Sequence, residues 1–151
     1  MRREKRPKAL RMLLEEGALA DVVREAQEVV ELALKAILRQ IGVEPPKQHD
    51  VGPLLVEYKH LLPPKAQENV YVLAKTSKWL RKEREFAFYG DMDFIRSLEY
   101  SRDDAEKAMQ AAVMAVATAR KVIPLPQQGS ASDFHWRIRS CAQLRSLQCR
   151  G

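Results

Sequence analysis

The sequence between Leu19 and Ile41 places the strongest constraint on the fold. Its apolar residues recur at the i, i+3, i+4, i+7 spacing of one face of an α-helix, and charged residues fill the other side. At about 1.5 Å per residue such a helix is roughly 33 Å long, about the span of a small domain. The stripe consists of Leu19, Val22, Val23, Ala26, Val30, Ala33, Leu34, Ile37 and Ile41, and it is widened by Val29, Leu32 and Ala36. A helix with so wide an apolar surface is expected to contact neighbouring helices on two sides.

Four further helices are predicted around it. A short one covers Lys8 to Glu16, and a third begins at His49–Leu55, with Asp50 as its N-cap and Leu54, Leu55 and Tyr58 as its buried face. A fourth runs from Pro64, which suits a first helical position, to about Phe88. Gly17 and Gly42 end the first two helices, and a loop is expected from Gly90 to Tyr100.

The fifth helix has a clear start. Ser101 to Asp104 has the form of a capping box, with Asp in place of the usual Glu, and Pro124 ends the helix that follows. Its predicted stripe is Ala105, Ala108, Met109, Ala112, Val113, Val116, Ala119 and Ile123. Its many alanines allow another helix to approach closely, and we favour packing within the bundle over a dimer interface. No stretch alternates like a strand. We therefore predict an all-α, up-and-down bundle of about five helices.

Residues 1–123 are expected to form this one domain, and residues 124–151 an irregular basic tail. From Gln127 onwards the tail has a Gly-Ser-Ala-Ser run near its start and mixes Trp, Arg and Cys without a period. We interpret it as a non-native extension rather than a basic interaction tail, and therefore leave it out of the fold. Both of the cysteines, Cys141 and Cys149, lie in it, which excludes a disulfide framework for the body.

The net charge of +6 is compatible with partners that carry phosphate. Four arginines and one aspartate after Pro124 give the tail +3, and subtracting this from +6 leaves +3 for the body. This falls short of the concentrated basic surface of a dedicated nucleic-acid binder. There is no apolar run of about 18 residues that would span a membrane, and no apolar signal-peptide core follows the charged N-terminus. A cytoplasmic location is therefore expected.

The candidate binding site is the end of the fourth helix. Trp79 and Phe86 lie seven residues apart, as do Leu80 and Ala87, so both pairs can face a helical core. The arginines between them then lie beside buried surface, and Gly90 ends the helix. The ligand-binding candidates are Arg81, Arg84, Tyr89 and Asp91, a set suited to a phosphate or a nucleotide. The competing interpretation is a solvated helix face that stops at a glycine.

Metal and cofactor chemistry has no support in the sequence. The three histidines, His49, His60 and His135, do not have the spacing of metal ligands. No glycine-rich phosphate loop or nucleophile elbow occurs, so a self-contained ATP site is not supported. We expect neither a metal nor a cofactor, and no catalytic residue can be assigned.

Three segments together resemble a known family. They are Ala26–Leu38 followed by Gly42, His49–Leu55, and Tyr100–Ala108. They resemble the HEPN domain (higher eukaryotes and prokaryotes nucleotide-binding) over about residues 6–123. The resemblance implies an all-α bundle of about five helices, usually a homodimer. It also implies a frequent partnership with a small nucleotidyltransferase in toxin–antitoxin pairs, and, for many members, metal-independent ribonuclease activity.

The ribonuclease motif of that family is an arginine, four to six residues, and then a histidine. No arginine in this sequence has a histidine at that spacing. Arg84 can be carried over as the arginine, but Tyr89 then takes the histidine position, and a phenol with a pKa near 10 is a poor base at pH 7. We therefore favour a dimeric module that binds nucleotide, RNA or a partner nucleotidyltransferase. A ribonuclease toxin with a variant site and a purely structural dimerisation bundle remain the alternatives.

Overall fold

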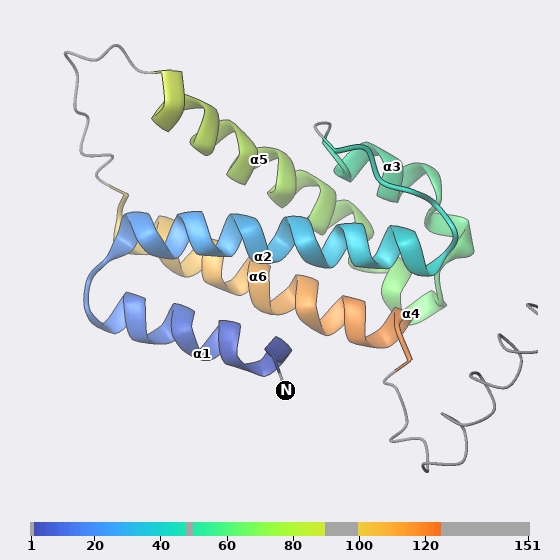
Figure 1. Ribbon diagram of the computed structural model, residues 1–151, viewed down its shortest axis with the longest axis horizontal. Helices are drawn as coiled ribbons and strands as arrows, with labels where there is room; N and C mark the ends of the chain where they lie inside the picture. Colours follow the sequence, from blue (N-terminus) through green and yellow to red (C-terminus); the bar gives the residue numbers. More distant parts are fainter. Residues whose placement is uncertain (1, 48–49, 90–99, 125–151) are drawn as a thin grey trace, which may run out of the picture.

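The computed structural model describes residues 2–47, 50–89 and 100–124, with side chains for 5–47, 50–83 and 100–124, and this part of the chain is helical throughout its regular structure (Figure 1). The elements are α1 (Arg2–Glu15), α2 (Leu19–Gln40), α3 (Gly52–Glu57), the 3₁₀ helix η1 (Lys59–Leu61), α4 (Pro64–Gln67), α5 (Val70–Tyr89) and α6 (Arg102–Val122). The four long helices α1, α2, α5 and α6 alternate in direction. The predicted all-α, up-and-down bundle is confirmed.

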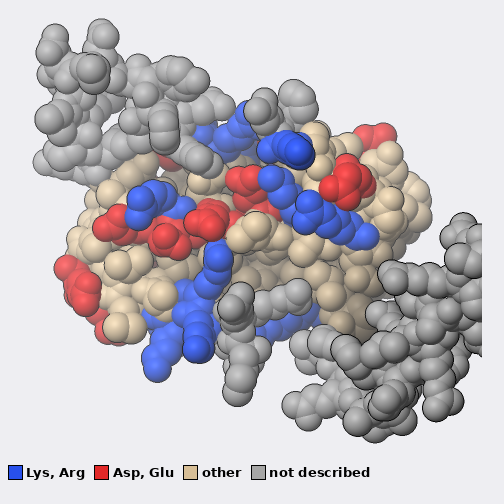
Figure 2. Space-filling view, in the orientation of Figure 1, with Lys and Arg blue, Asp and Glu red and all other residues tan. Residues whose placement is uncertain are grey.

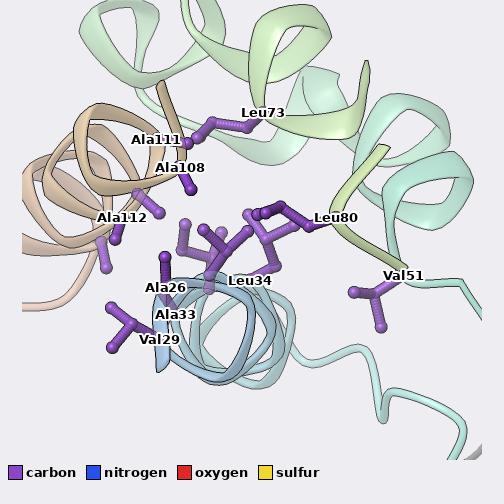
Figure 3. Packing of buried hydrophobic residues seen from close by; sticks show 14 of the residues in the cluster. Ala26, Val29, Ala33, Leu34, Val51, Leu73, Leu80, Ala108, Ala111 and Ala112 are labelled. Carbon is purple, nitrogen blue, oxygen red and sulfur yellow. The ribbon is translucent and has the colours of Figure 1, made fainter. Parts of the chain in front are cut away.

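The central pair of the bundle is α2 and α6, which pack along one another (Figure 3). Small side chains line the contact: Ala26 and Ala33 come from α2, and Ala108 and Ala112 from α6, all of them buried. Side chains of this size let two helix backbones approach closely. The alanine-rich face of α6 therefore packs within the molecule, as predicted.

The other two long helices flank this pair on opposite sides (Figure 1). α1 packs against α2 and α6 and buries Leu10 and Leu14. α5 packs against the same two helices and buries Leu73 and Leu80. Each of α2 and α6 thus contacts helices on both sides. For α2, this is the contact on two sides that its wide apolar stripe predicts.

Two apolar residues were placed wrongly by the periodicity. Leu32 on α2 is 48% exposed and Val113 on α6 is 43% exposed. At 100° per residue, Leu32 lies roughly 140° around α2 from the fully buried Ile37, and Val113 lies as far from Ala108. Both therefore fall outside the buried arc of their helix.

The first helix begins earlier than predicted, at Arg2 instead of Lys8. Pro7 lies inside it. A proline fixes φ at a helical value and removes one backbone N–H, which disturbs a helix least near its N-terminus. Beyond Pro7, Leu10 and Leu14 hold the helix against the core.

The predicted fourth helix is in fact two, α4 and α5, separated at Glu68 and Asn69. Pro64 does occupy the first turn of α4, as predicted. The carbonyl of Asn69 accepts the first backbone hydrogen bond of α5, from Leu73 N. The side chain of Asn69 donates to the hydroxyl of the buried Thr118 on α6, at 3.2 Å. This long-range hydrogen bond holds the start of α5 beside α6.

The predicted third helix also needs a correction. Its N-cap residue is Val51 rather than Asp50, although Asp50 Oδ1 accepts a hydrogen bond from Gly52 N at 3.0 Å. Leu55 is buried, whereas Leu54 and Tyr58 are half-buried. A Cβ on Gly52 would lie 3.1 Å from the carbonyl oxygen of Ala74, so α3 approaches α5 more closely than a side chain would allow.

The expected loop falls on residues 90–99, and His49 and the tail fall on 48–49 and 125–151, all outside the described residues. The domain boundary at 123 therefore stays a prediction. Among the described helices, none is long and apolar enough to cross a membrane.

Candidate functional site

Helix α5 carries three of the four predicted site residues, Arg81, Arg84 and Tyr89, in its C-terminal half. Arg81 and Arg84 lie three residues apart and so occupy neighbouring positions on the helix surface. Tyr89 lies roughly 12 Å further along the axis than Arg81, at 1.5 Å per residue. The side chains of Arg84 and Tyr89, and the whole of Asp91, lie outside the described part of the chain. The meeting of all four side chains stays a prediction.

The helix that carries these residues is held firmly by the core. Leu73 and Leu80 are buried, at 0% and 1% exposure, and Trp79 is half-buried against the same cluster. Arg81 follows directly and is itself half-buried. Arg81 therefore directly follows a residue that the core anchors.

A lysine of α6 contacts α5 just before the candidate arginines. Lys107 Nζ lies 4.4 Å from the centroid of the Trp79 ring, within the range of a cation–π interaction. This contact joins the two helices that frame the predicted loop. It places a third cation beside the arginine-bearing half of α5.

Tyr100, which precedes α6, also belongs to this region. It is half-buried and packs against the core cluster. Burial raises the pKa of its phenol, and the negative charges of Glu83 and Asp104 raise that pKa further. The phenol therefore keeps its proton near neutral pH and can act as a hydrogen-bond donor but not as a base.

The start of α6 is fixed by the predicted capping box. Ser101 Oγ accepts a hydrogen bond from Asp104 N at 3.1 Å, and Ser101 N donates to Asp104 Oδ2 at 3.2 Å. Both halves of the motif are present, so the prediction is confirmed. The box holds Asp104 close to Tyr100, whose phenol also feels the charge of Glu83 on α5.

Sequence reasoning missed both Lys107 and Tyr100. Lys107 lies 28 positions after Trp79 in the sequence, and neither spacing nor composition indicates that the two meet. The only available signal for Tyr100 is its place directly before the capping box.

A hollow of about 280 Å³ lies between α1 and α2. Its apolar lining is Ala9, Leu10, Leu13 and Val29, and its charged lining is Arg6, Asp21, Arg24 and Glu25. Arg24 pairs with Asp21 at 3.4 Å, and Arg6 pairs with Glu28 at 3.5 Å. Because these charges neutralise one another, the hollow selects neither an anion nor a cation.

An aromatic surface lies where η1 meets the start of α5. Tyr71 is 60% exposed, and Lys59 Nζ lies 4.5 Å from its ring centroid. Leu61 and Val72, which lie nearby in the sequence, are about half exposed.

Within the described residues, no group of three or more His, Cys, Asp or Glu side chains could hold a metal ion.

Comparison with known proteins gives one match. A family model described as HEPN domain matches residues 3–122, which takes in every described helix apart from the first residue of α1. Neither the curated proteins nor the solved structures gave a match.

Proposed function

This chain belongs to the HEPN domain family, and on that basis we propose that it is a cytoplasmic module that dimerises and binds a nucleotide or RNA, or a partner nucleotidyltransferase. The proposed site is the C-terminal half of α5 with Arg81 and Arg84, together with Tyr89 and Asp91. A role in a toxin–antitoxin pair belongs to the same proposal.

One observation carries the proposal. Arg81 and Arg84 lie three residues apart on a helix that Leu73 and Leu80 anchor in the core. Guanidinium groups bind phosphate oxygens with paired, charge-assisted hydrogen bonds, and a rigid backbone lowers the entropy lost on binding. Lys107 adds positive charge on the neighbouring helix, and the protonated phenol of Tyr100 offers a donor to a ribose or phosphate oxygen.

Ribonuclease chemistry has less support. The arginine–histidine spacing of the family is absent from the sequence, and the raised pKa of Tyr100 makes that phenol a worse base than free tyrosine. Binding without cleavage is therefore the expected behaviour.

Equilibrium binding tests the proposal. Fluorescence anisotropy with a labelled single-stranded RNA and with a labelled nucleotide should show binding that Arg84→Ala weakens by about tenfold or more, a loss of about 1.4 kcal/mol. Lys75→Ala is the matched control, because Lys75 is an exposed cation on the same helix. It should bind like the wild type.

Three results would count against parts of this proposal. If Arg84→Ala and the wild type bind the RNA and the nucleotide with equal affinity, the proposed α5 site is wrong. No affinity for nucleotide or RNA, together with no partner in a pull-down, would leave a structural bundle. Cleavage of the RNA in EDTA that disappears in Arg84→Ala would establish a ribonuclease with a variant site. Sedimentation equilibrium of the same protein tests the dimer.

A further inference from the structure

Among the described helices, α1 carries the largest net positive charge. α1 contains six basic and two acidic residues, a balance of +4. Subtracting this +4 and the +3 of residues 125–151 from the total of +6 leaves −1 for the rest of the chain. The rest includes α5, whose five basic and two acidic residues give +3, so the remaining residues sum to −4. The body is therefore not evenly basic: its positive charge lies on α1 and, to a lesser extent, on α5.

The outer side of α1 carries these charges towards solvent. Leu10 and Leu14 turn into the core, while Lys5, Lys8 and Arg11 are exposed at intervals of three residues. Lysines and arginines gather along the lower edge of the molecule in Figure 2, over α1, with acidic side chains on α2 above them. Lys5 to Arg11 span roughly 9 Å along the helix axis, which is enough to follow successive phosphates of one strand.

The charged residues on the two sides of α1 differ in whether they form ion pairs. Arg6, towards α2, pairs with Glu28 at 3.5 Å. Lys5, Lys8 and Arg11 form no ion pair with any residue whose side chain the structure describes. The outer face therefore offers positive charge that the fold leaves unneutralised.

Part of this charge pattern disfavours the free helix. Cations in the first turns lie at the positive end of the helix dipole, and like charges three residues apart repel one another, while Glu4 and Glu15, four positions from Lys8 and Arg11, offset some of that repulsion. A polyanion bound along the outer face would relieve both effects. The face therefore fits an anionic partner better than solvent alone.

We propose that the outer face of α1, formed by Lys5, Lys8 and Arg11, is a second contact surface that binds the phosphate backbone of an RNA strand. It rests on the proposed function in that RNA is the ligand, and it makes that ligand a polynucleotide rather than a mononucleotide. An anionic membrane fits less well, because Met12 is the one large apolar side chain that α1 exposes among its described side chains. A helix that lies on a bilayer needs a continuous apolar stripe facing outward.

Salt-dependent binding tests this surface. The variant Lys5→Gln/Lys8→Gln/Arg11→Gln is compared with Lys47→Gln/Lys65→Gln/Lys75→Gln, a control that removes the same charge from exposed lysines elsewhere. Anisotropy is measured with a labelled oligouridylate of about 20 nucleotides over a range of KCl concentrations. Each phosphate contact on single strands contributes about 0.7 to the slope of log K against log salt, so three contacts contribute about 2. The α1 variant should lose about this much of the slope and about a hundredfold in affinity at roughly 0.1 M salt.

The control variant should retain most of the affinity and the slope. A labelled uridine mononucleotide should bind the α1 variant as it binds the wild type, because a single phosphate at the α5 site does not reach α1. Circular dichroism of both variants checks that the helices are intact.

Failure of this inference can be told apart from failure of the α5 site. If Arg84→Ala weakens RNA binding and the α1 variant matches its control, the α1 surface is wrong and the α5 site stands. If the α1 variant loses affinity for RNA while Arg84→Ala does not, the α5 site is wrong and the α1 surface stands. Binding of the wild type to vesicles with anionic lipid but not to RNA would overturn the α1 inference in favour of a membrane.

Discussion

Two glycines set the ends of the first two long helices. Gly17 has φ +74° and Gly42 has φ +84°, in the left-handed region that L-residues with a Cβ rarely adopt. An added Cβ would meet no atom within 4 Å at either position. Their role is therefore one of backbone conformation and not of packing, and both helix ends were predictable from the sequence for that reason.

Gly42→Ala should lower the free energy of unfolding by about 1 kcal/mol, because alanine resists the left-handed conformation. Gly42→Asn should lower it less, since asparagine tolerates that conformation. Urea unfolding followed by circular dichroism measures both. An alanine variant as stable as the wild type would show that the helix end can adopt another conformation.

The candidate site shows the limit of prediction at this scale. Arg81 and Arg84 could be placed together from the sequence because one helix fixes their spacing. The cation–π pair of Lys107 with Trp79 could not, because its members lie on different helices and the crossing of α5 and α6 determines their contact. The spacing of residues within one helix does not show how that helix crosses another.

Among the elements, α2 and α6 were predicted best. Their apolar periods are long and their ends are marked, by Gly42 after α2 and by the capping box of Ser101 before α6. The break between α4 and α5 was missed because it depends on the hydrogen bond from Asn69 to Thr118, a residue of a distant helix. The early start of α1 was missed because the residues before Lys8 are almost all charged and show no apolar period.

The alanine contact between α2 and α6 gives a prediction for the pair. Ala112→Leu should destabilise the protein by about 1–3 kcal/mol, because the larger side chain must push two closely packed backbones apart. Ala117→Leu adds the same side chain on the exposed side of α6 and should change stability little. Thermal unfolding of both variants makes the comparison. Equal stability would mean that α6 can shift along or away from α2 at little cost.

At the scale of the whole molecule, the described core lies entirely between Leu10 and Ala119. A chain that ends at Pro124 should therefore have the same free energy of unfolding as the full chain. Chemical denaturation of the two proteins side by side measures this. A clear loss of stability in the shorter chain would show that residues 125–151 contribute to the fold and would contradict the boundary predicted from the sequence.

The pairing of α2 with α6 also bears on how the protein is made. The ribosome completes α2 long before it reaches Arg102, and α6 is the main cover for α2. Until α6 has emerged, the stripe from Val22 to Leu38 has only α1, α3 and α5 to shield it. The nascent chain therefore exposes an apolar helix face through most of its synthesis, and that interval is when it is most open to aggregation or to capture by a chaperone.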